Sequence, residues 1–105
     1  MSEPVTATLP LRRWQGDKAV YHLVSFTGAQ AEALAEHALM HRLEFGRSRG
    51  FGSVKVEAEI GETRWKSSVF PQDKQSEWIL LVSKKVMRAE DLAAGEEITV
   101  SVRPL

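Results

Sequence analysis

The stretch from residue 54 to residue 69 constrains the fold most, because it predicts a β-hairpin with one register. Gly61 and Glu62 supply a two-residue turn, with glycine first as a type II′ turn prefers. The pairs that this turn predicts are Ile60–Thr63, Glu59–Arg64, Ala58–Trp65, Glu57–Lys66, Val56–Ser67 and Val54–Val69. Opposite charges then meet on one face and apolar residues gather on the other. A slip of one residue would move the charges into the core, so the register is well specified.

Four further strands are predicted, over residues 8–14, 19–26, 78–82 and 98–102. A turn at Gly16 and Asp17 joins the first two strands. The pairs expected about this turn are Trp14–Ala19 and Arg12–Tyr21. Residues 78–82 are apolar without alternation, which predicts a strand that is buried on both faces.

One amphipathic helix is predicted after the second strand. Thr27 and Gln30 have the spacing of a capping box, which marks the start of a helix. The apolar positions at helical spacing are Ala31, Leu34, Ala35, Ala38 and Leu39. This stripe leaves out Met40 and Leu43, so we expect the helix to end or bend near residue 40, with Gly46 as a stop. A second, short helix is expected over residues 84–88, capped by Ser83.

These elements predict a mainly β fold, namely a small six-stranded β-barrel with one amphipathic helix and a short helical turn. Closing a barrel removes the edges that six short strands would otherwise expose. With 105 residues, the chain is expected to form a single domain over residues 8–105, preceded by a flexible tail over residues 1–7.

Composition narrows the function classes. Lysine and arginine number 14 and aspartate and glutamate also number 14, so the net charge is near zero, which argues against a nucleic-acid binder. The absence of cysteine excludes disulfides, thiolate catalysis and cysteine metal sites. With no apolar segment that would form a signal peptide or span a membrane, we expect a cytoplasmic protein without membrane contact.

The glycine- and arginine-rich segment before the central hairpin is the best candidate site. Arginines can bind an anion through two hydrogen bonds, and glycines let the backbone amides approach it. We therefore expect a small anionic ligand there, with Phe51 or Trp65 against an apolar part. The candidate residues are Arg47, Ser48, Arg49, Gly50, Phe51, Gly52, Ser53 and Trp65. In the structural alternative, the glycines form a turn, the arginines are solvated and Phe51 belongs to the core.

The same segment partly fits an RNA-recognition signature, through Arg49-Gly-Phe-Gly52 and Val54. Ser53 and Val56 stand where that signature has aromatic residues, and the motif precedes the second strand of such a fold rather than forming its third. Separately, by analogy with barrels in other families that bind DNA as interlocked dimers, a nucleic-acid-binding dimeric barrel is the alternative function.

The remaining chemical groups favour structural roles. His37 and His41 are four residues apart on the predicted helix, but no third ligand is defined, so no metal site and no cofactor are predicted. The basic residues Arg64, Lys66, Lys84, Lys85 and Arg88 are interpreted as a solvated surface, and Trp14, Tyr21, Trp65 and Trp78 as core. No spacing of nucleophile, acid and base points to catalysis.

Four segments of the sequence resemble the domain-of-unknown-function 1905 family. They are RGFGSVKVEAEIG at 49–61, WKSSVFP at 65–71, WILLVSKKVMR at 78–88 and LAAGEEITVSV at 92–102. The resemblance implies a double-split β-barrel in a bacterial family. That family occurs alone or fused ahead of a helical domain found in stress- or bacteriocin-protection proteins, and the resemblance implies no catalytic residues.

The sequence therefore predicts a binding module that is not an enzyme, for a small anionic ligand or a protein partner. Whether the chain is a monomer or a homodimer stays open.

Overall fold

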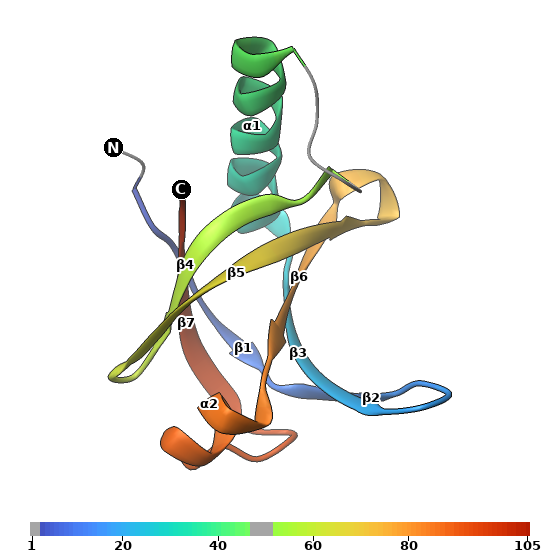
Figure 1. Cartoon of the computed structure of the whole chain (residues 1–105), viewed down its shortest axis with the longest axis vertical. Coiled ribbons are helices and arrows are strands. Elements are labelled where there is room, and N and C mark those ends of the chain that lie inside the picture. Colours follow the sequence, from blue (N-terminus) through green and yellow to red (C-terminus); the bar gives the residue numbers. More distant parts are fainter. Residues whose placement is uncertain (1–2, 47–51) are drawn as a thin grey trace.

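The computed structural model describes residues 3–46 and 52–105. These residues form seven strands, two α-helices and one 3-10 turn (Figure 1). The strands are β1 (Val5–Pro10), β2 (Arg12–Gln15), β3 (Val20–Phe26), β4 (Val54–Ile60), β5 (Thr63–Gln72), β6 (Glu77–Val82) and β7 (Glu97–Pro104). The helices are α1 (Gly28–Phe45) and α2 (Lys84–Ala89), and the 3-10 turn is η2 (Asp73–Gln75). All neighbouring strands are antiparallel, in the order β1-β7-β4-β5-β6-β3-β2.

The sheet curls because β1 and β2, which are consecutive in sequence, lie at opposite ends of its strand order. β1 pairs with β7 at one end of the strand order and β2 pairs with β3 at the other, although only Leu11 separates β1 from β2. The N–H of Leu11 donates to the carbonyl of Glu96 at 2.8 Å, and its own carbonyl accepts from the N–H of Gly95 at 2.7 Å. The predicted barrel-like β fold is confirmed, with seven strands instead of six because the first strand divides at this buried leucine.

The central hairpin has the register that the sequence predicts. β4 and β5 pair from Val54–Val69 through to Ile60–Thr63, with Glu59 opposite Arg64. Gly61 has φ +57°, whereas Glu62 does not have a positive φ, which is the pattern of a type II′ turn. The turn chemistry and the charge pattern therefore act together to fix this hairpin.

The predicted register of the first hairpin is wrong. Trp14 lies opposite Tyr21, not Ala19, and Arg12 lies opposite Leu23. The loop has four residues instead of two, and the N–H of Gly16 donates to the carbonyl of Ala19 at 2.8 Å. A shift of two residues leaves every side chain on its predicted face, so hydrophobic patterning does not distinguish the two registers. The observed one stacks Trp14 on Tyr21, with ring centroids 5.6 Å apart.

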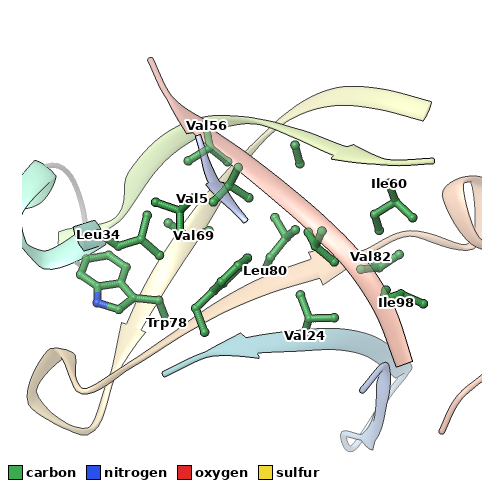
Figure 2. Close-up of a cluster of buried hydrophobic side chains, with 14 of the residues drawn as sticks. Val5, Val24, Leu34, Val56, Ile60, Val69, Trp78, Leu80, Val82 and Ile98 are labelled. Carbon is green, nitrogen blue, oxygen red and sulfur yellow. The ribbon is translucent and has the colours of Figure 1, made fainter. Parts of the chain in front are cut away.

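The core fills the space inside the curled sheet (Figure 2). Alternate residues of the strands point inward, so the core is built from Val24, Val56, Ile60, Val69, Trp78, Leu80, Val82, Ile98, Val100 and Val102, among others. Trp78 is fully buried, as predicted, and its indole Nε1–H donates to the carbonyl of Gln75 at 3.1 Å. Trp14 and Tyr21, by contrast, are exposed and do not belong to the core, which corrects the sequence interpretation.

Helix α1 is longer than the sequence predicts. It continues without a break to Phe45, and Gly46 ends it in the left-handed conformation, with its N–H donating to the carbonyl of Arg42 at 2.7 Å. The predicted bend near residue 40 is wrong, but the stop at Gly46 is confirmed. Only Ala31 and Leu34 are buried, because the second half of α1 extends beyond the sheet (Figure 1).

Strand β6 is buried on one face only. Trp78, Leu80 and Val82 point into the core, whereas Ile79 is half-buried and Leu81 is 41% exposed. The prediction of burial on both faces is therefore wrong. The two helices explain this, because α1 and α2 lie at the two ends of the sheet and not over its outer face (Figure 1).

Three smaller features complete the fold. Ser83 caps α2 as predicted, since its Oγ accepts a hydrogen bond from the N–H of Val86 at 3.3 Å. Strand β1 begins at Val5, so residues 5–7 pair with β7 although the sequence prediction placed them in the tail. Neither helix among the described residues has the length and apolar character needed to cross a membrane.

Candidate functional site

The predicted site falls largely outside the described residues. The predicted site residues outside the described ranges are Arg47, Ser48, Arg49, Gly50 and Phe51. The residues of the site that the structure places are Gly52, Ser53 and Trp65.

Gly52 and Ser53 border a hollow of about 400 Å³ between the second half of α1 and the start of β4, which we call the α1 hollow. The residues that line it include Ala38, His41, Arg42, Glu44 and Phe45 of α1, Lys55 of β4, and Leu105 after β7. One wall is therefore helical and the other comes from the strand that follows the candidate loop. The hollow combines apolar surface with the basic side chains of Arg42 and Lys55 and one carboxylate, that of Glu44.

The backbone conformation of Gly52 explains how the chain passes along the hollow into β4. Gly52 has φ +70°, in the left-handed region that disfavours residues with a Cβ. The chain then turns into β4, where Val54 is buried and Lys55 is exposed, as the alternation of a strand requires. The ring of Phe45 contacts the ring of His41, with centroids 4.7 Å apart, and forms the aromatic part of the wall.

The basic groups of the α1 hollow are available to a ligand. Arg42 and Lys55 are exposed, and neither forms an ion pair with any residue in 3–46 or 52–105. His37 and His41 line the same hollow. Across these described ranges, no group of three or more His, Asp or Glu side chains is placed to hold a metal ion. The polar groups of this wall therefore offer hydrogen bonds and charge attraction, beside its apolar surface.

Trp65 lies elsewhere in the fold. It pairs with Ala58 near the turn of the central hairpin, whereas Val54, which follows Ser53, pairs with Val69. Four residues of strand separate Trp65 from Val69, or about 13 Å. Trp65 lines a second hollow of about 380 Å³, with His22, Val82 and Lys84 among its walls. The structure therefore does not bring Trp65 together with Gly52 and Ser53.

The charged outer face of the central hairpin is partly neutralised. The Nε of Arg64 donates to a carboxylate oxygen of Glu59 at 2.9 Å. This hydrogen bond, together with the negative charges of Glu59 and Glu57, raises the pKa of Arg64 above its ordinary value. Lys66 on the same face forms no ion pair within the described part of the chain. The predicted Glu59–Arg64 pair is thus confirmed as an ion pair, and Lys66 keeps an unpaired charge.

Sequence reasoning missed the wall that α1 contributes. It left Met40 and Leu43 outside the apolar stripe and drew no site from them, yet the helix continues and carries Arg42 and Phe45 to the α1 hollow. Gly46 is the sequence signal that could have revealed this wall. A glycine that ends a helix at this position requires a helix that reaches residue 45.

Comparison with known families identifies the family of this chain. The profile of the family described as Domain of unknown function (DUF1905) matches residues 8–102, so the chain belongs to this family. A comparison with curated proteins found no match.

Proposed function

We propose that this member of the DUF1905 family is a binding module and that the α1 hollow is its site for a small anionic ligand. The observation that carries the proposal is the composition of the hollow. Arg42 and Lys55 supply cationic groups without ion-pair partners among the described residues, and Phe45 with Ala38 supplies apolar surface. A ligand with an anionic end and an apolar part matches both.

The position of the hollow also supports the proposal. Its wall includes Gly52 and Ser53, at the end of the segment in which the sequence predicts an anion site. Arg47 and Arg49 precede these residues by a few positions, so they lie close enough in the chain to add donors to the same ligand. The hollow is also of a size typical of small-molecule sites, which measure about 300–1,000 Å³.

A thermal-shift experiment tests the proposal. The probes are inorganic phosphate, citrate, adenosine diphosphate and phenyl phosphate, the last of which combines an anion with an aromatic ring. A ligand at 100 times its Kd stabilises the folded protein by about 2.7 kcal/mol, which is a shift of roughly 10–20 °C for a domain of this size.

Variants locate the binding. Arg42→Gln, Lys55→Gln and Arg49→Ala are expected to reduce the shift produced by the best probe. Arg103→Gln is the matched control, because Arg103 is an exposed arginine on β7 that does not line the α1 hollow. No shift with any probe, or the same loss in the control as in the three variants, would contradict the proposal.

A further inference from the structure

The second hollow, which Trp65 lines, lies where strands β5 and β6 separate. β5 pairs with β4 from Thr63 to Val69, but it pairs with β6 only from Val69 to Gln72. From η2, β5 runs to the turn of the central hairpin, whereas β6 runs to α2, so the two strands diverge (Figure 1). The hollow of about 380 Å³ occupies this gap, because Ser67 and Val82 in its walls lie just beyond the end of the β5–β6 pairing.

The walls of the second hollow bring together an aromatic ring, a hydroxyl group and an imidazole. Residues directly opposite each other in an antiparallel pair share a face, and so do residues two apart on one strand. Trp65 pairs with the buried Ala58, so Trp65 and Ser67 point to the inner face of β5. His22 of β3 pairs with the buried Val82 and points to the inner face as well. All three side chains are half-buried, which leaves part of each open to a ligand.

The polar side chains of this hollow have no partners among the described residues. Lys84 forms no ion pair within residues 3–46 and 52–105. The indole N–H of Trp65 can only donate, and neither it nor the hydroxyl of Ser67 makes a hydrogen bond to a described residue. No carboxylate from these ranges lines the hollow, and that of Glu90 accepts its hydrogen bond from Thr63 instead. The hollow therefore offers a positive charge and hydrogen-bond donors to a ligand that accepts.

From this arrangement we infer that the second hollow binds an aromatic monocarboxylate. The ring of the ligand packs against the indole of Trp65, as aromatic rings do in offset-stacked pairs. In the β5–β6 register Lys84 would stand opposite Trp65, so these two residues lie across the gap from each other. The carboxylate accepts hydrogen bonds from the ammonium group of Lys84 and the hydroxyl of Ser67, and such charge-assisted bonds are the strong ones.

The charge of the hollow favours a carboxylate over other polar groups. One lysine balances the single negative charge of a carboxylate, whereas a phosphate monoester carries about −1.5 to −2 at neutral pH. A cationic ligand would place its charge beside that of Lys84, with no carboxylate of the described residues in the walls to offset the repulsion. An uncharged ring would pack on Trp65 but leave the charge of Lys84 without a partner.

This site is separate from the α1 hollow. No described residue lines both hollows, and Trp65 lies near the turn of the central hairpin, away from Gly52 and Ser53. The inference does not rest on the proposed function, and each can fail without the other.

A titration followed by NMR tests this inference. The probes are benzoate and cinnamate, with benzamide and cinnamamide as neutral counterparts of the same shape, and inorganic phosphate as an anion without a ring. The signals followed are the indole N–H of Trp65, identified by its loss in Trp65→Phe, and the backbone N–H of Ser67. We expect a saturable shift with the carboxylates, binding of the amides weaker by about tenfold or more, and no shift with phosphate.

The matched variants are Lys84→Gln and Lys85→Gln. Both lysines are exposed and adjacent on α2, but only Lys84 lines the second hollow. We expect Lys84→Gln to weaken carboxylate binding about tenfold or more, and Lys85→Gln to leave it unchanged. Arg42→Gln, in the α1 hollow, should also leave it unchanged. Thermal melts verify that the variants fold.

Four results would overturn the inference. The first is no saturable shift of either signal with both carboxylates, and the second is equal binding of a carboxylate and its amide. The third is the same loss of binding in Lys85→Gln as in Lys84→Gln. The fourth is loss of the shift in Arg42→Gln but not in Lys84→Gln, because the carboxylate would then bind in the α1 hollow.

Discussion

Replacing Gly61 by alanine tests the central hairpin and its contact with α2 together. Gly61 is the first turn residue, with φ +57°, and a Cβ there would overlap the carboxylate of Glu90, which follows α2. That carboxylate accepts a hydrogen bond from the hydroxyl of Thr63 at 2.6 Å. The substitution therefore introduces backbone strain and also displaces Glu90 from its partner.

The expected cost has two parts. A residue with a Cβ in the left-handed region costs about 1–2 kcal/mol. The Glu90 side chain can move away from a new Cβ, but it then loses a hydrogen bond of a kind that contributes about 1.5–3 kcal/mol when one group is charged. Gly61→Ala should thus lower the free energy of unfolding by about 2.5–5 kcal/mol. For a domain of this size that corresponds to a Tm lower by at least about 10 °C.

A double-mutant cycle separates the two parts. In the Glu90→Ala background the overlap is absent, so Gly61→Ala should cost only the strain of about 1–2 kcal/mol. Gly28→Ala is the matched control, because Gly28 has φ +58° and no atom within 4 Å of an added Cβ. The measurements are urea unfolding curves of the parent, the single variants and the double variant. If Gly61→Ala costs the same with and without Glu90, and no more than Gly28→Ala, the proposed contact is wrong.

Two further predictions concern a buried leucine and a buried hydroxyl group. Leu34→Ala should lower the free energy of unfolding by about 2–5 kcal/mol, because Leu34 is fully buried. Leu43→Ala on the same helix should change it by less than about 0.5 kcal/mol, because Leu43 is 70% exposed. Equal effects of the two substitutions in urea unfolding would contradict the packing of α1. Ser25→Ala should raise the free energy of unfolding by about 1 kcal/mol, because the Oγ of Ser25 is buried without a hydrogen-bond partner among the described residues. A lower Tm for Ser25→Ala would show that this hydroxyl is paired.

The two hairpins show what a sequence does and does not specify. In the central hairpin, the glycine of the turn, the facing charges and the apolar face all agree on one register, and that register is observed. In the first hairpin, Gly16 and Asp17 suggest a turn but do not fix its length. Because the alternative registers differ by two residues, both keep the same faces, and only the stacking of Trp14 on Tyr21 favours the observed one.

Helix α1 and strand β6 show a second limit. Helical spacing identifies Ala31 and Leu34 as core, but it does not reveal that the sheet ends before the helix does, which leaves Leu39 exposed. In the same way, the apolar run of β6 indicates a strand but not how many of its faces are covered. Such exposure depends on the arrangement of whole elements. The candidate site was predicted from one loop, so its helical wall, with Arg42 and Phe45, was missed.

The place of β7 between β1 and β4 has a consequence for how the chain is made. Thr6 and Ser101 face each other across a separation of 95 residues. A ribosome adds about 5–20 residues per second, so β1 is synthesised roughly 5–20 s before its partner. Folding dominated by such distant pairings takes milliseconds to seconds once the chain is complete. β1 therefore waits for its β7 partner throughout the synthesis of the strands between them, and the sheet is complete only when β7 has been made.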